Sequence, residues 1–341
     1  MNTPRFVRPK FGELCLAENF DYRPFDELLE STPGVDVFCS SSRWTESARH
    51  AFKPSAPLVV YRARDAYALF TPSVTPEGMN VLVPLDSTWM LGSPIASADP
   101  ARDVDELIEK LLADRHCYDF IIISGLEYDS PIFRAVLSSL LIRRARISLA
   151  GQVERCVADL SAGVDAWLAR RSGKFRASIR RAVRACEDAG IHYVAIPQHA
   201  FGDSLFQVFL ELENRSWKGA QATGISEASM ASFCHGVMER TRGEAMTRGV
   251  LAFHENEVVG FAFGALMDNR YRGVQMSYDD RYRQHGLGNA IQIALMQQLA
   301  REGAQSYDLG SAMPYKHRWA DFSDASTTIV VNLTVPNIDR G

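Results

Sequence analysis

Several features that would place this chain in a common protein class are missing from its sequence. The six cysteines in 341 residues form no C-x-x-C pair, which argues against a zinc or redox site and for buried, reduced thiols. The eight histidines include no H-E-x-x-H spacing, so no metal is expected. No stretch approaches the roughly 18 apolar residues of a membrane-spanning helix, and the basic N-terminus lacks the apolar run of a signal peptide. We therefore expect a cytoplasmic protein without a membrane partner.

Three widespread catalytic or nucleotide-binding motifs are also missing. There is no G-x-S-x-G elbow of a serine hydrolase, no glycine loop followed by the Lys-Ser/Thr of a P-loop, and no third glycine of a dinucleotide fingerprint. The net charge of −4 gives no general reason to expect nucleic acid as a partner. Hydrophobic content of 46% and charged content of 23% are ordinary for a globular protein, and the length predicts two domains.

The most informative feature that is present is a glycine turn at residues 283–288. It reads Arg283-Gln284-His285-Gly286-Leu287-Gly288, and it separates a strand-like segment, Tyr271–Tyr278, from a segment of helical period, Asn289–Glu302. Glycine lets a backbone approach a ligand closely, and the first N–H groups of a helix have no partner within the helix. Together with the helix dipole they form a site for phosphate or pyrophosphate, although two glycines at such a junction also occur as plain turn chemistry.

The order of predicted elements extends well beyond this turn. Upstream are a strand, two helices and two hairpin-linked strands, and downstream are two more strands (Ile191–Ile196, Asp203–Trp217, Glu227–Arg240, Gly249–His254, Val258–Met267, Gln305–Leu309 and Thr327–Val335). The first half repeats a similar α/β pattern, with a hairpin over residues 58–70 and a short strand at Met90-Leu91, but it has no comparable glycine turn. We predict two α/β domains, residues 1–160 and 161–341, each with a mixed, mostly antiparallel sheet flanked by helices.

One strongly basic run, Ala169–Arg184, is predicted to be helical. Apolar residues recur in it every four positions, with cations between them. It has two interpretations: the solvated face of a docked helix, or a surface that contacts CoA phosphates, an anionic substrate or tRNA. Lys174 and Arg176 at its start are the candidates for substrate contact.

The Arg-x-x-Gly-x-Gly spacing and the element order resemble the GNAT superfamily of N-acyltransferases, whose corresponding loop holds the pyrophosphate of acyl-CoA. Further segments resemble the CelD-like branch, which is related in fold to the Fem-type aminoacyl-tRNA-dependent transferases (Gly173-Lys174-Phe175-Arg176, Ser216-Trp217-Lys218-Gly219, Ser277-Tyr278-Asp279, Tyr307-Asp308-Leu309-Gly310 and Pro314 to Trp319). The resemblance covers about residues 160 to 335. It implies tandem GNAT-like domains, the first of them degenerate.

The resemblance also implies an activity. The second domain is expected to move an acyl group from acyl-CoA, with acetyl-CoA the first choice, to an amine on a small-molecule or biosynthetic acceptor. Two alternatives remain open: a Fem-like transferase that uses aminoacyl-tRNA, and a non-catalytic acyl-CoA-binding protein. The complete glycine turn favours acyl-CoA over charged tRNA as the donor.

The site residues follow from the turn and from the chemistry of a direct transfer. Binding of the cofactor is assigned to Arg283, Gly286, Leu287, Gly288 and Asn289. Amine attack on a thioester needs a base and an acid. Asp308 is the predicted base, with a structural ion pair to Lys316 or Arg318 as the alternative. Tyr278 is the predicted proton donor to the thiolate, with a core position as the alternative.

Four further residues are predicted to contact the acceptor: Trp217, Lys218, Lys316 and Trp319. The tryptophans would wall the pocket, and Lys316 would bind a carboxylate or phosphate. The alternatives are tryptophans that simply pack and a lysine exposed on a loop. Glu211 and Glu213 either hold a substrate ammonium or are solvated carboxylates.

Overall fold

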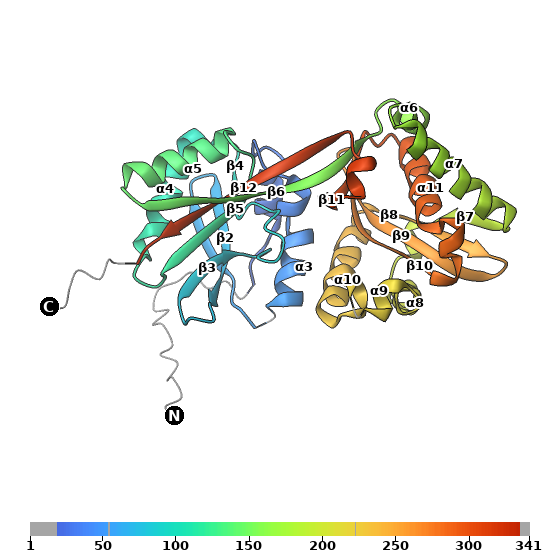
Figure 1. Ribbon diagram of the computed structural model, residues 1–341. Coiled ribbons are helices and arrows are strands. Elements are labelled where there is room, and N and C mark those ends of the chain that lie inside the picture. The colour runs from blue at the N-terminus through green and yellow to red at the C-terminus, as the bar shows by residue number, and fades with distance from the viewer. Residues whose placement is uncertain (1–18, 54, 222, 335–341) are drawn as a thin grey trace. The chain divides into compact units, whose positions relative to one another are not determined.

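The computed structural model describes residues 19–53, 55–221 and 223–334, and these form two compact units (Figure 1). The second unit is Glu154–Asp324, and the first contains the described residues up to Val153 together with those from Ala325 onward. The predicted boundary near residue 160 thus lies a few residues late. The last strand, Phe322–Asn332, was predicted to belong to the second domain. From Thr327 onward it pairs with a strand of the first unit, Phe120–Leu126.

The first unit contains a mixed sheet whose strands run in the order β1-β2-β3-β5-β12, with β4 paired to β2. The β3–β5 pair is parallel, whereas the β1–β2, β2–β3, β2–β4 and β5–β12 pairs are antiparallel. The elements of this unit are α1 (Arg23–Leu29), α2 (Val37–Ser40), α3 (Ser42–Phe52), β1 (Val59–Ala63), β2 (Ala66–Val74), β3 (Asn80–Pro84), β4 (Ile95–Ser97), α4 (Pro100–Ala113), β5 (Phe120–Leu126), α5 (Pro131–Ile142) and the parts of β6 (Arg146–Asp159) and β12 (Phe322–Asn332) that belong to it.

Both faces of this sheet are covered because its strands alternate apolar side chains on the two sides. Val59 and Tyr61 pack in the cluster formed with α4 and α5, whereas Leu58 and Val60 pack in the cluster formed with α1. A period of two along a strand sends successive side chains to opposite faces. The first unit is therefore a sheet between helices.

In the second unit the strand order is β6-β11-β10-β9-β8-β7. Only the β10–β11 pair is parallel. Besides its part of β6, the unit contains α6 (Gly163–Ala169), α7 (Gly173–Asp188), β7 (Ile191–Ala195), η1 (Gln198–Ala200), α8 (Asp203–Asn214), α9 (Trp217–Ala220), η2 (Gly224–Ser226), α10 (Ala228–Arg242), β8 (Thr247–His254), β9 (Glu257–Met267), β10 (Arg270–Tyr278), η3 (Asp280–His285), α11 (Leu287–Arg301), β11 (Ser306–Ser311) and η4 (Lys316–Arg318).

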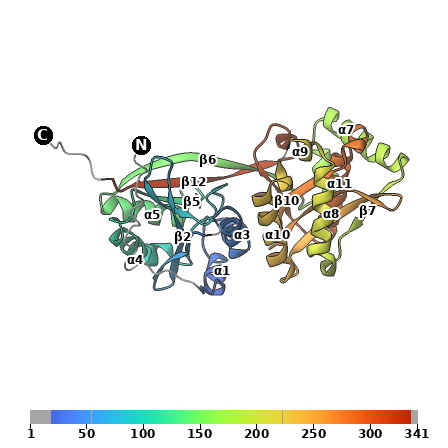
Figure 2. The same ribbon diagram turned by 90° about the horizontal axis from the view of Figure 1, so that it is seen from below.

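Two groups of helices cover the two faces of this second sheet (Figures 1 and 2). Helices α6, α7 and α11 share one apolar cluster with the strands, in which Ile291 and Leu295 of α11 are fully buried. On the other face, Phe209 of α8 stacks on Phe261 and Phe263 of β9 at ring-centroid distances of 4.1 and 5.2 Å. In the described part of the chain, no helix combines the length and apolar character needed to cross a membrane.

The fold-class prediction of α/β units with mostly antiparallel sheets flanked by helices is confirmed, but several element bounds differ. Met90-Leu91 is not a strand; β4 begins five residues later at Ile95. The basic run is split between α6 and α7, because Ser172 caps α7 by accepting a hydrogen bond from the Phe175 N–H. The predicted end of the last strand, Val335, lies outside the described residues.

Candidate functional site

The glycine turn has the geometry that its sequence predicted. Gly286 has φ 73° and forms the N-cap of α11, while its N–H donates to the Arg283 carbonyl at 3.0 Å. A Cβ at Gly286 would lie 2.8 Å from the Cβ of Ala182 on α7. Both the left-handed backbone and the close approach to α7 therefore require glycine here.

The first turn of α11 offers backbone donors. Among the described residues, the N–H groups of Leu287 and Gly288 have no acceptor, whereas that of Asn289 donates to the Gly286 carbonyl at 2.9 Å. Arg283 is exposed just before the turn. Free amides, the positive end of the helix dipole and a nearby guanidinium together suit a pyrophosphate. The five predicted cofactor residues thus lie in one short segment.

Tyr278 lies directly against this turn. A Cβ at Gly288 would be 2.7 Å from the Cε1 atom of the Tyr278 ring. The tyrosine is half-buried at the end of β10, and burial raises the pKa of its phenol above the ordinary value. A phenol that stays protonated at neutral pH is suited to donate a proton.

Strands β10 and β11 stop pairing midway. Their parallel ladder contains only Arg270↔Ser306, Tyr271↔Tyr307 and Arg272↔Asp308, although β10 continues to Tyr278 and β11 to Ser311. On its other edge β10 has an irregular register against β9 between Gly273 and Gln275. Beyond the Arg272↔Asp308 pair, the edges of β10 and β11 that face each other are not paired, so their backbone groups can contact a ligand. We call this stretch the strand gap.

Asp308, the predicted base, is held in a buried ionic cluster. Its two oxygens accept hydrogen bonds from Arg155 at 2.7 Å and Arg272 at 2.6 Å, and the Gly310 N–H donates to it at 2.7 Å. Both carboxylate oxygens are occupied by hydrogen-bond donors of the protein itself. The structure thus does not favour Asp308 as a base. The alternative prediction paired Asp308 with Lys316 or Arg318. The ion-pair partners of Asp308 are instead Arg155 and Arg272.

Two lysines reach the strand gap from separate elements. Lys218 of α9 donates to the Met276 carbonyl on β10 at 2.7 Å, and Lys316 of η4 donates to the Ser311 carbonyl on β11 at 3.2 Å. Burial, assisted by the charge of Arg272, lowers the pKa of Lys316 to about 8. Burial also lowers the pKa of Lys218. The structure therefore brings together two predicted acceptor-binding residues.

Glu213 is fully buried beside Lys218. Its Oε1 accepts hydrogen bonds from Gln275 at 2.7 Å and from the Ile225 N–H at 3.1 Å, and it lies 4.0 Å from the Lys218 ammonium. The carboxylate therefore positions Lys218 and is not solvated, whereas Glu211 is exposed on the same helix.

The two predicted pocket tryptophans have different environments. Trp217 is 44% exposed at the start of α9. Trp319 is 6% exposed and stacks on Trp167 with ring centroids 5.4 Å apart, and the Trp167 indole N–H donates to the Trp319 carbonyl at 2.9 Å. Trp319 is therefore part of the core of the second unit, and the prediction that it walls a pocket is corrected.

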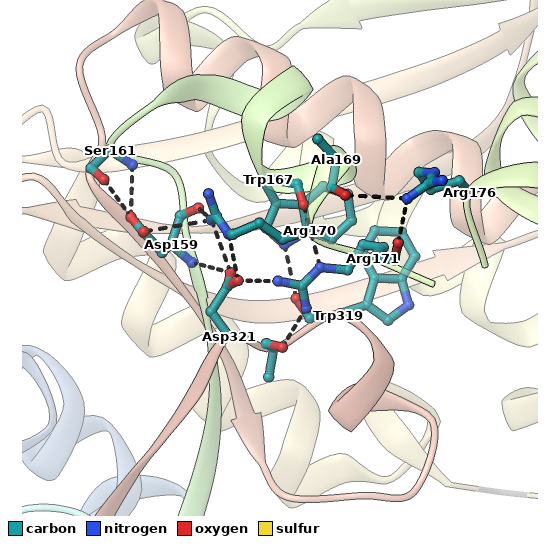
Figure 3. Close-up of polar contacts among 10 residues, drawn as sticks. Asp159, Ser161, Trp167, Ala169, Arg170, Arg171, Arg176, Trp319 and Asp321 are labelled. Carbon is teal, nitrogen blue, oxygen red and sulfur yellow. Dashed lines mark hydrogen bonds and ion pairs between the residues drawn. The ribbon is translucent and has the colours of Figure 1, made fainter. Parts of the chain in front are cut away.

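Several cations of the basic run have structural roles (Figure 3). Arg170 bonds to Asp321 at 2.8 Å, and Arg171 bonds to Asp321 and to the Ala320 carbonyl. Arg176 donates to the carbonyls of Arg171 and Ala169 at 2.7 and 3.2 Å, so it closes the end of α6, and its contact with a substrate stays a prediction. Lys174 is exposed and stays a prediction.

Within the described part of the chain, one group of side chains has ligand atoms close enough for a metal ion: Asp203, His235 and Glu239. The His235 ring nitrogen lies 2.8 Å from Asp203, and this ion pair already accounts for the arrangement. We assign no metal to it. The five cysteines in the described residues are free thiols.

Three residues of the strand gap were not found from the sequence: Arg155, Arg272 and Gln275. The available signal was a charged residue inside a strand that is covered on both faces, since Arg155 and Arg272 are buried together with their neighbours Cys156 and Tyr271. Such charges are buried only when they are paired.

Comparisons with known proteins agree with this geometry. Residues 173–317 match the family model described as the acetyltransferase (GNAT) domain. No curated protein matches the sequence. Among solved structures, the chain is similar to a protein of unknown function from Bacteroides thetaiotaomicron VPI-5482 (12% identity, covering 94% of this chain and 100% of that one, TM-score 0.60) and to FemX (11%, 91% and 96%, 0.61). It is also similar to L-PGS from Bacillus licheniformis (14%, 93% and 93%, 0.55). At these identities the similarity shows a shared fold.

Proposed function

We propose that this protein transfers an acyl group from acyl-CoA to an amine, because residues 173–317 match the family model described as the acetyltransferase (GNAT) domain. The observation that carries this proposal is the glycine turn, with two free amides in the first turn of α11 beside Arg283. The fold is equally that of FemX, so the choice of acyl-CoA over aminoacyl-tRNA rests on this turn.

Acyl-CoA would lie with its pyrophosphate on the turn and its pantetheine arm along the strand gap. Leu287 and Gly288 would donate their N–H groups to the pyrophosphate, and Arg283 and Asn289 would add side-chain contacts. The thioester would then lie between the unpaired edges of β10 and β11. A backbone N–H at such an edge would stabilise the oxyanion of the tetrahedral intermediate.

The transfer forms a C–N bond and breaks a C–S bond. The neutral amine attacks the thioester carbonyl, the intermediate collapses, and the CoA thiolate leaves with a proton from Tyr278. The amine's own proton passes to water, because both oxygens of Asp308 are engaged by arginines, and Tyr278 regains its proton from the solvent. Holding both substrates in one site supplies much of the rate.

Replacing Tyr278 with phenylalanine is expected to lower kcat by roughly a hundredfold, because general acid catalysis typically contributes that much. The ring still packs on Gly288, so the Kd for CoA should stay within about twofold of the parent value. Thiol release measures kcat and calorimetric titration measures the Kd. A kcat within about threefold of the parent would remove Tyr278 from the mechanism.

The donor class is tested by calorimetric titration of the full chain with CoA and acetyl-CoA, followed by thiol-release assays with a panel of amines. Micromolar binding and amine-dependent release of free thiol support the proposal. Transfer that needs aminoacyl-tRNA and is abolished by RNase would establish the Fem-like alternative instead. Binding of CoA without turnover of any amine would favour a non-catalytic acyl-CoA-binding protein.

A further inference from the structure

Cations gather around the strand gap. Arg155, Arg272, Lys218 and Lys316 lie there, each buried or half-buried. Among the described residues, the carboxylates paired with these cations are Asp308 between the two arginines, Glu213 beside Lys218, and Asp324, which lies 3.9 Å from Arg155 and also pairs with the exposed Arg270 at 2.7 Å.

Lys316 differs from the other three cations of the strand gap, each of which lies within ion-pair distance of a carboxylate. Among the described residues, no carboxylate lies within ion-pair distance of its ammonium, whose contacts are the Ser311 carbonyl and the ring of Tyr315. A half-buried ammonium group is costly unless an anion compensates it. Burial, followed by the charge of Arg272, lowers the pKa of Lys316, and the charge of Asp308 only partly offsets these effects.

Lys316 and Arg272 converge over Gly310. A Cβ at Gly310 would lie 3.3 Å from the Lys316 Nζ and 3.7 Å from an Arg272 guanidinium nitrogen. Gly310 has φ 87°, so the backbone there favours a residue without a side chain. A planar anion above Gly310 would contact the ammonium of Lys316 from η4 and the guanidinium of Arg272 from β10.

We propose that Lys316 and Arg272, with Lys218 at the neighbouring edge, form a subsite for a carboxylate carried by one of the two substrates. This inference rests on the proposed function and adds the chemical class of the substrate. The carboxylate belongs either to the acceptor, as in an amino acid, or to the acyl group, as in a dicarboxylic acyl-CoA. The same positive charge disfavours an acyl group that carries an ammonium, as in aminoacyl-tRNA.

The subsite is tested directly by competitive labelling. The full chain is treated with a limiting amount of an acetylating N-hydroxysuccinimide ester, and modification of each lysine is followed by mass spectrometry. Succinate should slow the modification of Lys316 severalfold, whereas succinamide, its neutral analogue, should not at matched ionic strength. Lys110 of the first unit serves as the internal control, since neither compound should protect it. Equal protection by both compounds, or none by succinate, would overturn the proposal.

Two further measurements, of acyl-CoA affinity and of kcat/KM, identify which substrate carries the carboxylate. If the acyl group carries it, succinyl-CoA should bind at least about tenfold more tightly than acetyl-CoA. If the acceptor carries it, kcat/KM with acetyl-CoA should be at least about tenfold higher for amino acids than for the corresponding decarboxylated amines. If CoA binds and neither preference is found, the subsite is rejected while the proposed function stands. If succinate protects Lys316 and no CoA binds, the proposed function fails and the carboxylate subsite stands.

The variants Lys316→Met and Lys316→Arg separate charge from packing. Methionine keeps most of the apolar stem and loses the ammonium, so the carboxylate preference should disappear while the Kd for CoA is unchanged. Arginine keeps the charge and should retain most of the preference. A preference that survives in Lys316→Met would assign the carboxylate to other groups and contradict the proposal.

Discussion

Replacing Gly286 with glutamate is expected to weaken the binding of acyl-CoA by at least about a hundredfold. The substitution places a carboxylate at the N-cap of α11, where the pyrophosphate is proposed to lie, and like charges repel strongly at a site built for anions. Gly286 also has a positive φ and close contact with Ala182, so any side chain displaces the turn. Calorimetric titration with CoA measures the loss.

The matched control is Gly303→Glu. Gly303 follows the other end of the same helix and has a similarly positive φ of 84°, and a Cβ there would meet no other described atom within 4 Å. The two variants therefore share backbone strain and added charge, and they differ in the helix end that is changed and in the contact with Ala182. Equal CoA affinity in the two variants would show that the glycine turn is not the donor site.

Replacing Trp319 with alanine is expected to lower the free energy of unfolding of the second unit by about 3–5 kcal/mol, the usual cost of removing a buried aromatic side chain. Trp319 stacks on Trp167 and meets the ring of Phe175 edge-on at 5.3 Å, so the variant leaves a cavity between α6, α7 and η4. Urea unfolding followed by circular dichroism measures the change without depending on tryptophan emission.

Trp217→Ala removes the same side chain from a position that is 44% exposed, and should cost less than about 1 kcal/mol. The sequence assigned one role to both tryptophans, and this pair of variants distinguishes the two environments. A similar loss of stability in both variants would contradict the burial described for Trp319.

The local parts of the site were predictable from the sequence because their physics is local. The glycine turn depends on the conformational freedom of Gly286 and on the free amides of the helix that follows, and both are properties of a few consecutive residues. The strand before the turn follows from alternation of apolar residues, and the helix after it follows from the helical period of its apolar residues. The fold class could therefore be derived before any contact was known.

The polar network of the strand gap could not be predicted in the same way. Arg155 and Asp308 are 153 residues apart in the chain, and only the pairing of β6 with β11 brings them together. Without that register Asp308 looks like a free carboxylate and Arg176 like a surface cation. The role of each depends on which distant backbone or charge it meets, which a local pattern does not contain.

The division of the chain into units has a consequence for its synthesis. Leu126 of β5 pairs with Thr327 of β12, so the first unit obtains its last strand only after the whole second unit has been made. The second unit is one continuous segment and can complete its fold while it leaves the ribosome. The first unit is thus synthesised first and completed last. Until β12 is made, the edge of β5 that will pair with it stays open. Such an edge can mispair with another nascent chain or be bound by a chaperone.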